Sequence, residues 1–198
     1  LEPLGVKVTS DFSTEPSQLD FSAAVLKAKQ SSADVVFVYV NEEEAARVLR
    51  ELRKQGVTKP IVGETVLTSQ KVIELAGDAA NGAVAHVGLT VDAPTPAMRA
   101  FRARFEKEYK YTTDHNGVKG YTGVYIMKAA LEKAGKVDRQ LFAQTMKGLK
   151  ISVAQHPNVL MDVSFDAHGD LDRESFLVEA RGGRQEVRQI LPALGAAK

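Results

Sequence analysis

The feature that most constrains the fold is an uninterrupted run of apolar, β-forming residues from Val35 to Val40. Such a run is typical of a parallel strand that is covered on both faces, because a strand with one solvent face alternates apolar and polar residues. A helix pattern follows directly, from Glu42 to Gln55, with apolar residues at helical spacing and Gly56 to end it. We therefore predict that residues 35–40 form an inner strand of a parallel sheet.

Strand and helix patterns alternate through the first half of the chain. The other expected elements there are, in order, a strand at 5–10, a helix at 20–29, a strand at 60–63, a helix at 69–77 and a strand at 82–89. This alternation favours an α/β fold with an open parallel sheet and flanking helices. In the second half, the expected elements are helices from Thr95, at 119–134 and at 138–148, and a closing hairpin of 175–180 and 186–191.

Composition narrows the functional class. The chain has 198 residues, 44% hydrophobic and 26% charged, with a formal net charge of +1, so nothing marks it as a nucleic-acid or membrane-surface binder. It has no cysteine, which excludes a disulfide framework and a thiolate nucleophile. No stretch approaches the roughly 18 apolar residues of a membrane span. Because Leu1–Gly5 has neither an initiator Met nor the pattern of a signal peptide, we expect a fragment.

Sequence signatures of catalysis are missing. There is no nucleophile elbow, no P-loop and no dinucleotide fingerprint. Asp166–Asp172 resembles a calcium loop, but its glycine stands at the wrong position, so an Asx-rich turn is the better interpretation. The histidines lie too far apart for the spacing of a metal site; they are His86, His115, His156 and His168. We expect no enzyme activity, no cofactor and no metal.

Polar residues directly follow two of the expected strands. In open α/β sheets ligands bind at the carboxyl ends of the strands, and neighbouring parallel strands bring those ends to one edge. We therefore predict that the residues after these two strands converge on one concave face and contact a ligand. They are Asn41 and Glu42 after the first strand, and Glu64 and Thr65 after the second.

The other acidic residues of the first helical turn after Asn41 have a simpler interpretation. Glu43 and Glu44 lie where the helix dipole favours negative charge. We interpret both as solvated residues without a part in binding.

Several segments resemble one known family. They are Ala33–Val38 with Ala45–Gly56, the string L-A-G-D-A-A-N-G at Leu75–Gly82, Y-T-G-V-Y at Tyr121–Tyr125, and F-D-A-H-G-D at Phe165–Asp170. The string at Leu75–Gly82 is the most specific of them. Through these segments nearly the whole chain resembles the leucine/isoleucine/valine-binding proteins, which are type I periplasmic binding proteins.

The resemblance implies a fold of two α/β lobes, joined by three crossovers, that hold a ligand in the cleft between them. It implies that residues 1–88 and 173–198 form the second lobe. Residues 89–172 are then the C-terminal part of the first lobe, the rest of which is missing. The implied function is that of a periplasmic solute-binding receptor of an ABC importer, with an amino acid or related small carboxylate as ligand and an ABC permease as partner. The alternative is a ligand-sensing module of a regulator or receptor with the same fold.

The resemblance also bears on single residues. An acidic residue after the strand at 60–63 commonly receives the ligand's ammonium group in this family; Glu64 has this chemistry, with Thr65 at the aligned place. His115 and Asn116 lie in a turn that can face the cleft. The loop that often presents an aromatic residue in amino-acid binders carries Asn41 and Glu42 instead.

The missing part of the first lobe has a consequence for assembly. The helices at 96–150 would cover a sheet that is largely absent, which would leave apolar faces open at Met98-Phe101-Phe105 and Leu141-Phe142-Met146. Large exposed apolar patches are rare in monomers. We therefore expect the fragment to self-associate.

Overall fold

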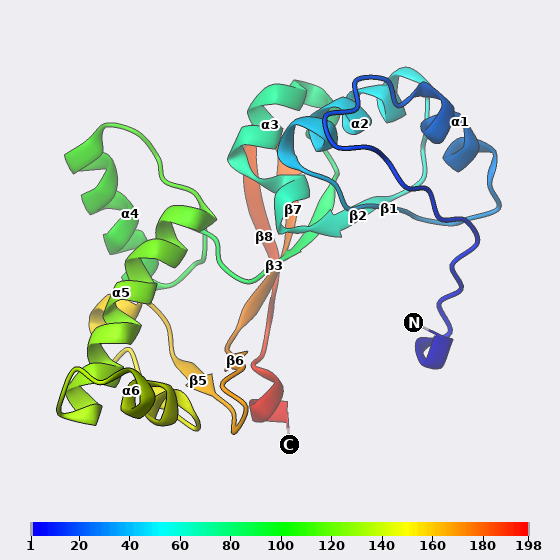
Figure 1. The fold of residues 1–198 in the computed structure, drawn as a ribbon. Coiled ribbons are helices and arrows are strands. Elements are labelled where there is room, and N and C mark those ends of the chain that lie inside the picture. Colours follow the sequence, from blue (N-terminus) through cyan, green and yellow to red (C-terminus); the bar gives the residue numbers. More distant parts are fainter. Residues whose placement is uncertain (1, 198) are drawn as a thin grey trace. The chain divides into compact units, whose positions relative to one another are not determined.

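The structure is a computed structural model that describes residues 2–197 (Figure 1). The chain divides into two units, which are described separately below. The first unit contains the residues up to His86 together with Val178–Glu186. The second contains Val87–Leu177 and the residues from Val187 onward.

The main sheet has five strands in the order β1-β2-β3-β7-β8. They are β1 (Val36–Val38), β2 (Ile61–Glu64), β3 (Val84–Val87), β7 (Ser175–Arg181) and β8 (Arg184–Leu191). β1 pairs with β2 and β2 with β3, both in parallel, with Val36 opposite Ile61 and Val62 opposite Val84. The predicted parallel α/β sheet is thus confirmed.

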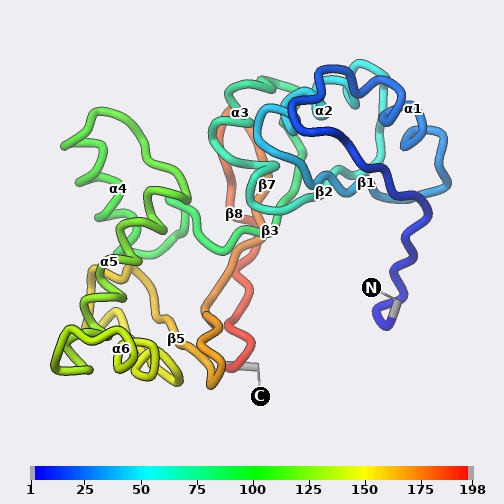
Figure 2. The backbone as a smooth tube through the Cα atoms, viewed as in Figure 1, coloured from blue at the N-terminus to red at the C-terminus, as the bar shows by residue number. Residues whose placement is uncertain are grey.

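The C-terminal hairpin is also confirmed. β7 and β8 are neighbours in the sheet, and Figure 2 shows them in orange and red, running side by side. The turn between them needs glycine, because Gly182 and Gly183 have φ angles of 56° and 81°. Side chains with a Cβ rarely adopt such angles.

Three helices cover one face of the sheet in the first unit: α1 (Ser22–Gln30), α2 (Glu42–Lys54) and α3 (Gln70–Ala76) (Figure 1). Short 3-10 helices lie at η1 (Glu2–Leu4), η2 (Thr65–Thr68) and η3 (Gly77–Ala80). Leu49 and Leu52 of α2 pack with Ile61 of β2 and Val72 of α3 in one buried core. The apolar stripe of α2 therefore anchors the unit, because burying such side chains contributes about 1.5–3 kcal/mol each.

The expectation of an inner strand at residues 35–40 is wrong. β1 covers only Val36–Val38 and lies at the edge of the sheet, although its pairing is parallel as predicted. Val38 is buried under the helices, whereas Phe37 and Tyr39 on the other face are 64% and 73% exposed. An apolar run shows that a segment favours a strand, but it does not show how many neighbours that strand has.

The strand expected at Gly5–Ser10 does not form. These residues are exposed and lie outside every strand (Figure 1). Among the described strands, β1 has one neighbour, β2, which places it at the edge of the sheet. The two errors have one physical cause: strand pairing is non-local, and the local sequence does not specify it.

The second unit combines three helices with a small antiparallel sheet. The helices are α4 (Pro96–Tyr109), α5 (His115–Ala134) and α6 (Arg139–Met146), with the 3-10 helices η4 (Pro157–Val159) and η5 (Leu194–Ala197). The sheet has the order β4 (Lys150–Ile151), β5 (Val163–Phe165) and β6 (Leu171–Asp172). Side chains cap two of these helices: Thr95 accepts a hydrogen bond from Met98 N at 3.2 Å, and Asp138 accepts one from Leu141 N at 2.8 Å.

The apolar face of α4 is not open. Met98 and Phe101 are buried within the second unit. Phe101 packs against Phe105 and against Tyr121 of α5, with ring centroids 5.9 and 4.7 Å apart. The expectation that this face is exposed is wrong, because α4 meets aromatic partners on its own unit. Self-association stays a prediction, and of the two faces it was based on, only the one at Leu141, Phe142 and Met146 of α6 remains partly exposed.

Candidate ligand-binding site

A pocket of about 380 Å³ opens in the first unit at the carboxyl ends of β1 and β2. Its lining comes from the residues after these two strands, from α2, and from a loop before α1. The lining residues are Thr14, Glu15, Pro16, Tyr39, Val40, Asn41, Glu44, Glu64 and Val66. We call it the acidic pocket, because three of its residues are glutamates and none is Lys, Arg or His.

Parallel pairing builds one wall of this pocket. Val38 lies opposite Gly63, so the segments that follow β1 and β2 leave the sheet at neighbouring points. A side chain at Gly63 would prevent this approach, because a Cβ there would lie 2.6 Å from the carbonyl oxygen of Val38. The strand ends therefore place Asn41 and Glu64 on the same pocket.

A hydrogen bond closes the other wall. The backbone N–H of Ser17 donates to Glu44 Oε1 at 2.8 Å, which ties the loop at residues 14–17 to α2. Arg47 reinforces this tie, because its Nη1 donates to the carbonyl oxygen of Gln18 at 3.3 Å. The pocket is thus made of segments far apart in the sequence.

The electrostatics of the acidic pocket favour a cation. The pKa of Glu44 is lowered from its ordinary value, chiefly because the N–H of Ser17 stabilises the carboxylate. Glu64 Oε1 accepts a hydrogen bond from Val66 N at 3.0 Å, which leaves further acceptor capacity on its carboxylate. Glu15 adds a third carboxylate at the exposed rim. Chemically, such a site suits an ammonium group and disfavours an anion.

The structure brings two of the four strand-end candidates together. Asn41 and Glu64 line the acidic pocket, but Glu42 and Thr65 are not among its lining residues. Glu42 is engaged elsewhere: Lys71 Nζ lies 3.4 Å from its Oε2, and Ser69 Oγ donates to its Oε1 at 3.3 Å. Thr65 begins η2.

The other two candidates lie in the second unit. The helix expected at 119–134 begins earlier, at His115, so His115 and Asn116 form the first turn of α5 and not a turn before it. The capping residue Asp114 accepts hydrogen bonds from the backbone N of Asn116 at 2.9 Å and from that of Gly117 at 3.0 Å. Neither candidate lines the acidic pocket, and contact of either with a ligand stays a prediction.

Sequence reasoning missed Glu44. It was interpreted as solvated, but it is only 6% exposed and accepts the bond that shapes the pocket. A signal was present, because Asn41 and Glu44 have the spacing of a capping box, in which the fourth residue turns back over the helix start. Glu43 is exposed, as predicted, with Arg47 Nη2 3.7 Å away.

Two further features concern metals and membranes. Within residues 2–197, no group of three or more His, Asp or Glu side chains is placed to hold a metal ion. The loop at Asp166 is an Asx turn, as predicted, because Asp166 Oδ1 accepts from the backbone N of His168 at 2.8 Å and of Asp170 at 2.9 Å. In the same described range, every helix is too short or too polar to cross a bilayer.

Comparison with known proteins gives one consistent result. The sequence pattern of a family described as periplasmic binding protein matches residues 1–185. The chain is 28% identical over 173 residues to Leu/Ile/Val-binding protein homolog 2 of Brucella abortus (strain 2308), which covers 86% of this chain and 44% of that protein.

Solved structures show the same fold. A leucine-binding protein from Thermotoga maritima superposes with a TM-score of 0.76 at 19% identity, covering 89% of this chain and 49% of the other. A solute-binding protein of an ABC transporter from R. palustris, in complex with benzoate, also gives 0.76, at 20% identity, with 90% and 49% covered. The chain therefore spans about half the length of the proteins it matches.

Proposed function

Because this chain belongs to the periplasmic binding protein family, with Leu/Ile/Val-binding proteins among its relatives, we propose that it is part of a periplasmic receptor for an ABC importer. Its ligand is an amino acid or a related small carboxylate, and its protein partner is an ABC permease. In such receptors a ligand shifts the population toward a closed form. This proposal needs no catalytic group.

The lobe assignment belongs to the same proposal. Residues 1–88 and 173–198 are assigned to the second lobe, and residues 89–172 to the first. The division of the chain into two units, which changes after His86 and again within β7 and β8, supports this assignment.

The acidic pocket is the observation that carries the proposal. Three carboxylates surround it, and its lining contains no cationic side chain. A purely anionic ligand such as benzoate would meet repulsion here, whereas an α-amino acid offers an ammonium group to the carboxylates. The pocket therefore supports amino acids over ligands that are carboxylates alone. Tyr39, Val40 and Val66 also line the pocket, and their apolar groups can contact an apolar side chain of the ligand.

A matched pair of ligands tests this proposal. L-Leucine and 4-methylpentanoate share a carbon skeleton and a carboxylate, but only leucine has the ammonium group. Titration of the 198-residue chain, followed by NMR, should show leucine shifting the amides of Asn41 and Glu64. The expected preference over 4-methylpentanoate is about ten- to a hundredfold, the value of one charge-assisted hydrogen bond. Equal binding of both compounds at these amides would contradict the proposal.

A further inference from the structure

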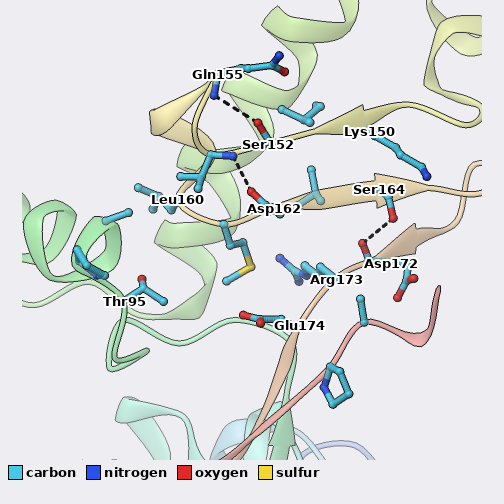
Figure 3. A pocket seen from close by; sticks show the side chains of 18 residues that line it. Thr95, Lys150, Ser152, Gln155, Leu160, Asp162, Ser164, Asp172, Arg173 and Glu174 are labelled. Atoms are coloured by element: carbon cyan, nitrogen blue, oxygen red, sulfur yellow. Dashed lines mark hydrogen bonds between the residues drawn. The ribbon is translucent and has the colours of Figure 1, made fainter. Parts of the chain in front are cut away.

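The second unit contains a larger pocket, of about 760 Å³, that the proposed function does not use (Figure 3). We call it the Arg173 pocket. It lies over the small sheet, next to the start of α4. Its lining is Thr95, Pro96, Ala97, Lys150, Ile151, Ser152, Val153, Gln155, Leu160, Met161, Asp162, Val163, Ser164, Asp172, Arg173, Glu174, Pro192 and Ala193.

Arg173 is a half-buried cation without a partner in the described part of the chain. Among the described side chains, no carboxylate lies within 4.0 Å of its guanidinium, and no described oxygen accepts a hydrogen bond from it. Its pKa is lowered, and burial is the cause. The guanidinium rests on the backbone of Gly88, where a Cβ would lie 3.0 Å from Nη2. Burial of an unpaired charge is costly, so an anion bound next to the guanidinium would be stabilised.

The acids of the same pocket are turned to other partners. Asp162 Oδ1 accepts a hydrogen bond from Val153 N at 2.7 Å. Asp172 accepts two, from Leu194 N at 2.8 Å and from Gly195 N at 2.7 Å. In Figure 3 the Asp172 side chain points away from Arg173, and Glu174, the next residue, is exposed. The chain thus contains acids near Arg173 but uses none of them to neutralise it.

The surroundings of Arg173 are apolar. Ile151, Leu160, Met161 and Val163 line the pocket and are themselves buried. An inorganic anion would gain nothing from these side chains, whereas a carboxylate on a hydrophobic body would contact both them and the guanidinium. A planar guanidinium matches a carboxylate with two parallel hydrogen bonds.

We propose that the Arg173 pocket binds a small molecule with a carboxylate on an aromatic or aliphatic body. The carboxylate pairs with the guanidinium over Gly88, and the body packs on the apolar wall of the small sheet. This site is separate from the acidic pocket, and its ligand needs no ammonium group.

Benzoate and benzamide test the charge requirement, because the two have the same shape and only benzoate is an anion. In a titration of the ¹⁵N-labelled chain, benzoate should saturate and shift the amides of Gly88 and of residues 161–164. Benzamide should bind about ten- to a hundredfold more weakly. Arg173→Gln should abolish this difference. Arg139→Gln, the same change at an exposed arginine outside the pocket, should retain it.

The thermal midpoint is a second measurement, because an arginine with a purely structural role would lower the midpoint when it is replaced. Because Arg173 makes no hydrogen bond among the described residues, Arg173→Gln should leave the thermal midpoint unchanged or raise it. A lower midpoint, or the same benzoate preference in Arg173→Gln as in the unaltered chain, overturns the proposal. Shifts by benzoate that map to the acidic pocket overturn it as well.

The proposals for the two sites can be tested independently of each other. Glu64→Gln should change the ratio of leucine to 4-methylpentanoate binding at Asn41 and leave the ratio of benzoate to benzamide untouched. Arg173→Gln should do the reverse. The loss of one preference therefore identifies the site that failed.

Discussion

Glu64 is the residue whose substitution tests the acidic pocket most directly. Its carboxylate lines the pocket and also accepts a hydrogen bond from Val66 N at 3.0 Å, at the start of η2. Glu64→Gln keeps the shape of the side chain and an oxygen for this bond, but it removes the negative charge. The substitution therefore separates a role in binding from a role in capping.

The expected magnitudes differ clearly between the two roles. A charge-assisted hydrogen bond from a ligand ammonium is worth about 1.5–3 kcal/mol, so its loss weakens leucine binding about ten- to a hundredfold. The capping bond is retained by glutamine, so the free energy of unfolding should fall by only about 0.5 kcal/mol. For a chain of this length, that corresponds to about 2 °C or less in the thermal midpoint.

The assay measures leucine affinity by NMR titration and the thermal midpoint by circular dichroism on the same samples. Glu43→Gln is the control with the same chemical change, because Glu43, in the first turn of α2, is exposed and does not line the acidic pocket. This control should leave leucine affinity unchanged. Unchanged affinity in Glu64→Gln would refute the assignment of the ammonium to Glu64, whatever the thermal midpoint does.

Two further predictions concern stability. Gly63→Ala should lower the free energy of unfolding by about 1–3 kcal/mol, because the added Cβ would lie 2.6 Å from the carbonyl oxygen of Val38. Gly120→Ala should raise it by about 0.5–1 kcal/mol, because Gly120 is exposed on α5 and a Cβ there would have nothing within 4 Å. Urea titrations of both variants check the two signs. Glu44 and Asp166 have pKa values lowered from 4.5 and 3.8 by backbone N–H donors, so their contribution to stability is fully present above these values and is lost as the pH falls through the lowered pKa. Glu44→Gln should therefore flatten the acid side of the stability curve, and an unaltered curve would show that Ser17 does not stabilise the carboxylate.

Local patterns predicted the parts of the fold that local interactions decide. The start of α4 follows from Thr95 and Pro96, and the start of α6 follows from Asp138, because a cap and its N–H partner are three residues apart. The hairpin turn follows from Gly182-Gly183. The alternation of strand and helix patterns predicted the α/β class, which the parallel pairing of β1, β2 and β3 confirms.

The site was predicted only in part, because half of it depends on contacts between distant segments. Asn41 and Glu64 could be placed from the rule that ligands bind at strand ends. The wall formed by Thr14 and Glu15 could not, because its position depends on the bond between Ser17 and Glu44, 27 residues apart. The edge position of β1 escaped prediction for the same reason: no periodicity shows whether residues 5–10 pair with it.

The edge position of β1 also affects how the isolated chain can be handled. Among the described strands, only β2 pairs with β1. Phe37 of β1 and the nearby Tyr39 are exposed and stack on each other, with ring centroids 6.5 Å apart. Natural sheets protect such edges with lysine, proline or a bulge, and residues 35–40 contain neither lysine nor proline. An apolar edge of this kind is a template onto which a strand from a second molecule can add, and then a third. Loss of material during concentration and storage is therefore expected to begin at β1, while the molecule is still folded.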